Sequence, residues 1–317
     1  MSICNYNTTF KGVNNISQDF LLNIVESNFK IFFDWAFLNI GSWFDVEISN
    51  STLFGTNKHS RLLLAEDPSY VEGSVWQGIR KDWVWESGVV FNEAAPTSIS
   101  GVFVNNVFQP LNSGYSINYP LGRVVFDDAV STNASVDLNY AYKHIQVYRS
   151  CDSPWLNILQ YSSYETNNQD ISRTDDGDWS IGGHHRIQMP AIVIESLSRS
   201  RSRPHEIGNN NLVIEQDIAF HVLAENKNER NKLLDILRLQ QDSVIYLFDT
   251  NQIAQNDEFP LDHNGSLKNN PLMYPGIVAK YPWRKCWIKN VNLFDIESSH
   301  TFLYRGLVRA TLEIISE

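Results

Sequence analysis

The alternation of apolar and polar residues from Leu212 to Val222 constrains the fold of this chain more than any other feature. A period of two sustained over so many residues predicts a long, half-buried strand. The apolar positions are Leu212, Ile214, Ile218, Phe220 and Val222, and the polar positions are Glu215, Asp217 and His221. The chain must therefore build a β-sheet that buries one face.

The segments around this strand extend the pattern to strand–loop–strand–helix–strand over residues 187–248. Pro190–Leu197 is β-branched and apolar, which predicts a strand, and residues 198–211 are rich in Ser, Arg, Pro, Gly and Asn, which predicts a loop. Asn226 followed by Glu229 is close to a capping box and predicts the start of a helix. Val244–Phe248 then returns as a strand. The whole unit contains no obvious set of catalytic groups.

The N-terminal third begins with a predicted helix. Residues 1–15 are expected to be a flexible arm, either docked on a neighbouring subunit or simply disordered. Ser17 is the expected helix cap, the helix runs to about Asn39, and Gly41 is its stop signal. Its apolar residues cover more than one stripe, so the helix is buried on more than one side or covered by a partner.

The following residues indicate a β-rich module. Asn105-Asn106 between two apolar runs predicts a hairpin, because Asn tolerates the left-handed turn conformation. Residues 134–148 alternate and predict one long strand, and residues 151–164 predict a short helix that starts after Asp152-Ser153-Pro154.

The polar, Gly-containing residues 165–186 predict a long loop and a domain boundary. After the central unit, residues 249–285 are turn-rich, and residues 286–296 and 301–315 predict a closing hairpin. The expected fold class is α+β, mainly β. We divide it into residues 1–165 (N-terminal helix and a β-sandwich-like module), 166–186 (loop or linker) and 187–317.

Composition restricts the function. The net charge of -11 argues against a protein that wraps nucleic acid, because phosphate contacts need Lys and Arg. Cys4, Cys151 and Cys286 form no CxxC pair, so zinc and redox motifs are unsupported. The N-terminus lacks the pattern of a signal peptide, and the apolar runs are too short to cross a membrane. We expect no cofactor.

Two motifs resemble proteins of tailed bacteriophages. The run MPAIVIE…RPHEIG…LVIEQDIAFHVLAENKNERNKLLDILR, within residues 187–317, resembles the tail-terminator and neck proteins of the virion. The pattern Y-x-I-x-Y…G-R-V-V-F-D…Y-x-Y, from Tyr115 to Tyr142, is similar to β-sandwich modules of phage virion proteins. The first resemblance implies that residues 187–317 form a tail-terminator-like α/β sandwich.

The resemblance also implies a function. The chain would be a structural virion protein at the head–tail junction, assembled in the host cytoplasm. It would form a closed ring with copies of itself, as a hexamer, and join the tail to the head while DNA passes through the bore. Its other partners would be neighbouring neck, connector or tail-tube proteins, with no membrane involved.

Two groups of residues are candidates for interfaces. Arg199, Arg201 and Arg203 form a basic patch in an acidic protein, so contact with an acidic subunit is favoured over DNA, and a solvated loop is the plain alternative. Trp76, Trp83 and Trp85 predict core or interface. If they form a sugar platform instead, the chain is a baseplate or receptor- or carbohydrate-binding virion protein.

Other constellations are weaker. Asp175, Asp176 and Asp178 with His184 and His185 could hold a metal, but they match no EF-hand spacing, so a solvated turn is the default. Basic and aromatic residues interleave from Lys280 to Lys289, which is typical of single-strand binding but equally of a half-exposed strand, and we favour the strand. The motifs G-x-S-x-G, G-x-x-x-x-G-K and H-E-x-x-H are missing, so we expect no enzyme; a cell-wall hydrolase would have no residue evidence.

Overall fold

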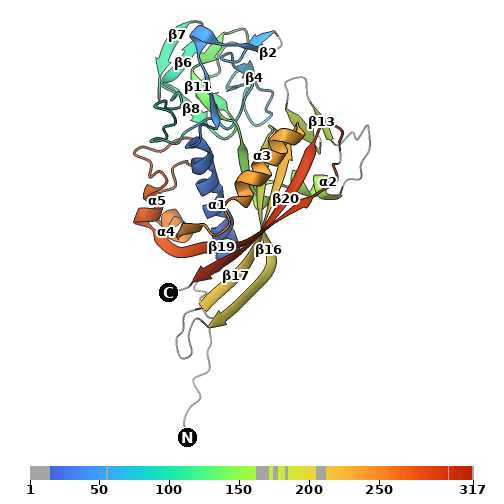
Figure 1. The fold of residues 1–317 in the computed structure, drawn as a ribbon. Helices are drawn as coiled ribbons and strands as arrows, with labels where there is room; N and C mark the ends of the chain where they lie inside the picture. The colour runs from blue at the N-terminus through green and yellow to red at the C-terminus, as the bar shows by residue number, and fades with distance from the viewer. Residues whose placement is uncertain are drawn as a thin grey trace.

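The computed structural model describes residues 15–54, 56–161, 171–173, 178–182, 185–204, 212–298 and 300–315. Strands predominate over helices, as the sequence predicted for an α+β, mainly β chain (Figure 1). The expected arm falls almost wholly outside the described residues.

A six-stranded sheet forms the centre of the molecule, with strand order β12-β16-β17-β20-β19-β18. All neighbours are antiparallel except β12 and β16, which are parallel. The long strand predicted around Leu212–Val222 is confirmed as β17. The strands are β12 (Gln146–Arg149), β16 (Ala191–Pro204), β17 (Leu212–Ala224), β18 (Val244–Phe248), β19 (Pro282–Asp295) and β20 (Tyr304–Ile315).

Two helices cover one face of this sheet, namely α1 (Leu21–Leu38) and α3 (Lys227–Arg238). Alternate strand residues such as Ile218 and Phe220 pack against aromatic residues of α1 and leucines of α3. The predicted cap of α3 is confirmed, because Asn226 Oδ1 accepts a hydrogen bond of 2.7 Å from the Glu229 N–H.

Helix α1 begins later than predicted. Its N-cap is Phe20, without a side-chain cap, and not Ser17. Asn251 explains the difference: its side chain accepts from the Asp19 N–H at 2.7 Å and donates to the Asp19 carbonyl at 2.9 Å. These tertiary bonds hold the preceding residues outside the helix. Helix α1 ends before Gly41, which has a φ of +79°, as the sequence predicted.

The β-rich module lies at one end of the molecule (Figure 1). Two of its sheets, β4-β5-β9-β8 and β10-β6-β7, pack around a common core. The Asn105-Asn106 hairpin is confirmed, with φ of 50° and 65° at the two turn residues. The module also contains the pairs β1-β11 and β2-β3. Its strands are β1 (Trp43–Val46), β2 (Leu53–Phe54), β3 (Asn57–Lys58), β4 (Leu63–Leu64), β5 (Val75–Gln77), β6 (Gly101–Val104), β7 (Val107–Pro110), β8 (Tyr115–Asn118), β9 (Arg123–Phe126), β10 (Val136–Leu138) and β11 (Tyr140–Lys143).

The prediction of one long strand over residues 134–148 is wrong. Three short strands replace it, and each has a different partner: β10 pairs with β6, β11 with β1, and β12 with β16. The chain changes sheets at Asn139, whose side chain accepts from the Ile48 N–H, and at His144, whose N–H donates to the Ser42 carbonyl. Apolar and polar residues continue to alternate across both changes of sheet, so the sequence pattern alone could not reveal them.

The predicted loop over residues 165–186 contains strands in its described part. β13 (Ile171–Arg173), β14 (Trp179–Ile181) and β15 (His185–Ile187) form an antiparallel sheet. It packs with helix α2 (Trp155–Tyr161), which confirms the short helix, on the opposite face of the six-stranded sheet from α1. Trp179 and Ile181 are buried, and their apolar contacts stabilise strands in a segment whose polar composition had predicted a loop.

The packing does not follow the expected division at residues 166–186. Helix α1 and strand β12 belong to the core of the six-stranded sheet, although both precede the division in sequence. The turn-rich residues 249–285 contain two short helices. The remaining helical segments are α4 (Thr250–Gln255), α5 (Gly276–Lys280) and the 3-10 turns Ile48–Asn50 and Ser150–Asp152.

Candidate functional site: a charged sheet face

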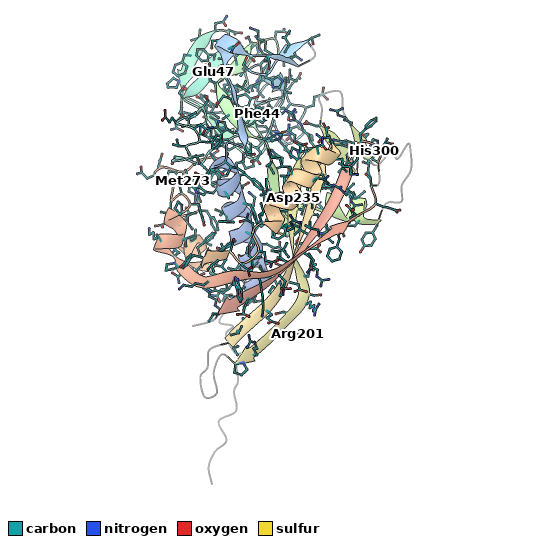
Figure 2. All side chains as sticks on the ribbon, viewed as in Figure 1. Phe44, Glu47, Arg201, Asp235, Met273 and His300 are labelled. Atoms are coloured by element: carbon teal, nitrogen blue, oxygen red, sulfur yellow. The ribbon has the colours of Figure 1, made fainter. Side chains whose placement is uncertain are left out.

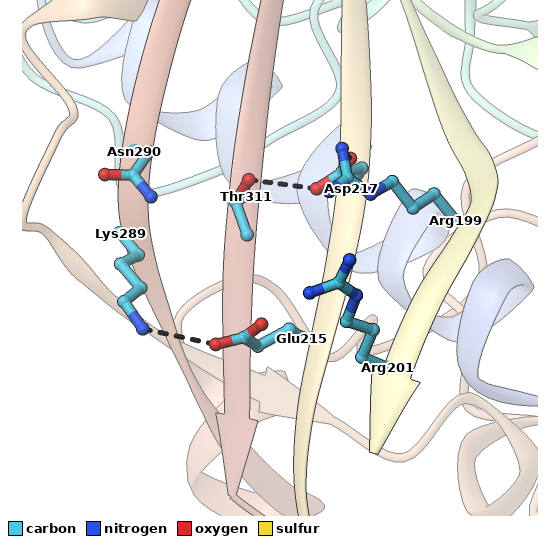
Figure 3. Close-up of a pocket in the computed structure, with 7 residues that line it drawn as sticks. All are labelled: Arg199, Arg201, Glu215, Asp217, Lys289, Asn290 and Thr311. Atoms are coloured by element: carbon cyan, nitrogen blue, oxygen red, sulfur yellow. Dashed lines mark hydrogen bonds and ion pairs between the residues drawn. The ribbon is translucent and has the colours of Figure 1, made fainter. Parts of the chain in front are cut away.

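The outer face of the six-stranded sheet, on the side away from α1 and α3, is the candidate functional site. Its half nearer the module is covered by α2 and the β13–β15 sheet. Its other half bears charged and polar side chains from β16, β17, β19 and β20 around a hollow of about 180 Å³ (Figure 3). Arg201 lies near one end of the molecule, and the module, with Phe44 and Glu47, lies at the opposite end (Figure 2).

Ion pairs cross this face from strand to strand (Figure 3). Asp217 Oδ2 lies 2.9 Å from Arg309 Nη2, and its Oδ1 accepts from Thr311 Oγ1 at 2.9 Å. Lys289 Nζ lies 3.2 Å from Glu215 Oε1 and 3.1 Å from Glu313 Oε2. The carboxylates of the face are therefore held by residues of β19 and β20.

The three predicted arginines are brought together on this face, beside those carboxylates. Arg199 Nη1 is 3.6 Å from Asp217, and Arg203 Nη2 is 3.5 Å from Glu313. Both contacts are long, and the two side chains are 61% and 62% exposed. Arg199, Arg201, Arg203, Lys289 and Arg309 face three carboxylates here, so the site has a surplus of positive charge on a strongly acidic chain.

The arginines do not lie on a loop, contrary to the prediction for residues 198–211. β16 continues to Pro204 and remains paired with β17. Two extra residues between Ser196 and Ser200 form a bulge, where the buried Gln216 side chain donates to the Leu197 carbonyl. The alternation of Ser and Arg over residues 198–203 has the period of a strand. Because this segment contains no apolar residue, the pattern was interpreted as a loop.

Where the charged half of the outer face meets the covered half, His221 pairs with Glu195. The distance between His221 Nε2 and Glu195 Oε2 is 2.7 Å, and this hydrogen bond lowers the pKa of Glu195. The pair continues the polar surface along β16 and β17.

The tryptophans are placed mainly in the core of the module. Trp83 is 0% exposed and Trp76 is 3% exposed, and Trp85 packs partly buried against the same cluster. Each indole N–H of Trp76 and Trp83 donates to a backbone carbonyl within its own turn, Gly73 and Arg80 respectively. These two rings are part of the core, so neither is accessible to a sugar.

Among the candidate metal ligands, Asp178 is the residue whose side chain is described, and it forms an ion pair. Asp178 is buried, pairs with Arg186 and accepts from Gln188 Nε2 at 2.9 Å, so it is not in a solvated turn. Asp175, Asp176, His184 and the side chain of His185 lie outside the described residues. Within the described ranges, no group of three or more His, Cys, Asp or Glu side chains could hold a metal ion.

The interleaved basic and aromatic residues lie largely on β19, as favoured. Trp287 lies directly opposite Val244 on β18, and Lys285 lies opposite Tyr246. The Lys285 and Lys289 ammonium groups lie 5.5 Å and 5.9 Å from the ring centroids of Tyr246 and Trp287. These contacts stabilise a partly exposed strip beside the charged face.

A buried ionic cluster between α1 and the module was missed by sequence analysis. Lys143 is 2% exposed, and its Nζ lies 2.6 Å from Glu86, 3.4 Å from Asp34 and 3.8 Å from Asp82. Burial opposes its charge, but the three carboxylates outweigh burial and raise the pKa of Lys143. No sequence motif marks it, because its members come from separate elements.

A second hollow, of about 320 Å³, lies where the module meets β12 and β15. Lys81 lines it, donates to the Arg186 carbonyl at 2.7 Å, and lies 5.2 Å from the Tyr148 ring centroid. Burial lowers the pKa of Lys81 to about 8. The contact helps to fix the module against the sheet.

Comparisons with protein families, with curated proteins and with solved structures found no match to this chain. Among the helices of the described residues, none is long and apolar enough to cross a membrane.

Proposed function

We propose that this chain is a structural protein of a tailed-phage virion, of the neck or tail-terminator type, located at the head–tail junction. Copies of the chain form a ring, a hexamer by analogy with the proteins it resembles, and the ring joins the tail to the head. Neighbouring neck, connector or tail-tube proteins bind it, and DNA passes through the bore. The protein is assembled in the host cytoplasm and needs no cofactor.

The charged half of the outer sheet face is the observation that carries the proposal. The opposite face buries α1 and α3, whereas this half presents arginines with long, exposed ion pairs. Exposed arginines on a sheet suit contacts with acidic proteins, because the guanidinium binds carboxylates through two parallel hydrogen bonds. The net charge of -11 supports a bore along which DNA slides without binding.

A baseplate or receptor-binding role is the alternative. The burial of Trp76 and Trp83 removes the platform expected for it. Exposed Leu53, Val107 and Phe108 on the module are the apolar surface that such a role would use instead.

Cosedimentation with isolated phage tail tubes and binding to a glycan array separate the two roles. The head–tail role predicts association with the tubes and no retained glycan. Glycan binding without tube association would contradict it. A variant with Leu53→Ser and Val107→Ser is the matched control, because it should lose glycan binding only under the alternative.

A further inference from the structure

One side of β16 lacks a strand partner over much of its length. β12 pairs with β16 only at Ala191–Ile194, and the Ser196 N–H donates to Glu26 Oε1 at 2.7 Å. Among the described residues, nothing pairs with residues 197–204 on that side. Alternate N–H and C=O groups of an edge strand face away from its neighbour, so this segment can accept another strand. Figure 1 shows β16 and β17 extending together away from the module.

The side chains of this edge determine which strand would fit. Among the described residues, Arg199 and Arg203 make only long ion-pair contacts, and Arg201 has no ion-pair partner within 4.0 Å. The nearby carboxylates have shorter contacts elsewhere: Asp217 with Arg309, and Glu313 with Lys289. The three guanidinium groups can therefore bind carboxylates from outside the chain.

A second copy of this chain does not fit. Pairing β16 with β16 would place arginines opposite arginines, and like charges directly opposite destabilise a sheet. The strand at the other edge of the sheet, β18, has the sequence VIYLF and offers no carboxylate. Neither β16 nor β18 of a second copy therefore offers an acidic strand, and we take the occupant to be a segment of a different protein.

We infer that the edge of β16 at residues 197–204 binds an extended acidic segment of another protein, which adds a strand and aligns its carboxylates with Arg199, Arg201 and Arg203. This inference rests on the proposed function, because it supplies the means of attachment to a neighbouring virion protein. Backbone hydrogen bonds give affinity, and the arginines select for acidic side chains.

A fluorescent octapeptide of alternating Glu and Val is the probe, and fluorescence anisotropy against the full chain is the measurement. Two further peptides serve as controls: one replaces Glu by Gln, and the other carries N-methyl groups on alternate residues and cannot pair as a strand. We expect each to bind about tenfold more weakly or worse, since one lost charge-assisted hydrogen bond already corresponds to about that factor.

The protein variant Arg199→Gln, Arg201→Gln, Arg203→Gln should lose binding by a similar factor. Arg238→Gln, which removes an exposed arginine on α3, should bind as the wild type does. Equal binding of the Glu and Gln peptides, no binding of either, or unchanged binding to the triple variant would overturn the inference. Ring formation is measured separately, so rings without peptide binding would remove the inference and leave the proposed function intact.

Discussion

Lys143 joins α1 to the module through a buried ionic cluster. It is the cation that Asp34, Glu86 and Asp82 share in the buried cluster, and its Nζ also lies 5.3 Å from the Trp85 ring centroid. Burial raises the pKa of Glu86 and of Asp82, so both carboxylates depend on the lysine to remain charged.

Lys143→Met should lower the free energy of unfolding by about 3–5 kcal/mol, because removing one partner leaves uncompensated buried charges. Urea denaturation at neutral pH measures the change. Lys58→Met, at an exposed position, is the control and should change little. A loss below about 1 kcal/mol, the value of a surface pair, would contradict this account of the cluster.

Lys81 gives a pH dependence of stability. Burial lowers its pKa to about 8 from an ordinary value of 10.5, so the unfolded state binds more protons between these values. The free energy of unfolding contributed by this residue therefore rises as pH increases from about 8 to 10.5, and the penalty is fully present below about 8.

Lys81→Met should lack this rise. Denaturation of the wild type and the variant at several pH values gives the difference between the two curves, which cancels the groups they share. Below about pH 8 the free energy of unfolding of the variant should be higher relative to the wild type than it is at high pH. Parallel curves would show that the folded structure does not disfavour the charged lysine.

Among the helices and strands, the sequence predicted those starts and turns that are fixed by residues close together in the chain. The start of α3 was predictable because Asn226 and Glu229 satisfy each other's polar groups within one turn. The Asn105-Asn106 turn was predictable because both residues tolerate positive φ. The start of α1 was not, because Asn251 fixes it from a distant part of the chain.

The candidate site was predictable in composition but not in geometry. The sequence singled out Arg199, Arg201 and Arg203, but only pairing with β17 places them beside Glu215 and Asp217. The contributions of Lys289 and Arg309 were hidden, because β19 and β20 reach the face through pairings distant in sequence.

Asn226→Ala should destabilise the protein by about 1 kcal/mol, because the Glu229 N–H loses its acceptor. Chemical denaturation measures this loss. Asn228→Ala, an exposed position within the same helix, matches the substitution without removing a cap. If both variants lost the same stability, the cap would not be the cause.

At the scale of the whole molecule, the chain folds back on itself. Phe29, Phe33 and Phe37 of α1 fill the core between the six-stranded sheet and α3, and β12 pairs with β16. Residues 187–317, the segment expected to form the ring, therefore contain only part of the core of the six-stranded sheet.

A fragment of residues 187–317 should fail to unfold cooperatively and should expose apolar surface, because α1 and β12 are missing. Near-UV circular dichroism and thermal unfolding of the fragment measure this. Addition of a synthetic peptide spanning residues 17–41 should restore part of the signal if the lost contacts are the cause. Cooperative unfolding of the fragment alone would show that the segment is independent of α1.

Mass photometry of the purified full chain, with negative-stain microscopy of the same sample, tests the proposed assembly role most directly. We expect closed rings of about six copies with a central hole, formed at high protein concentration or on isolated tail tubes. Single copies under both conditions, together with binding to host-surface glycans, would contradict it.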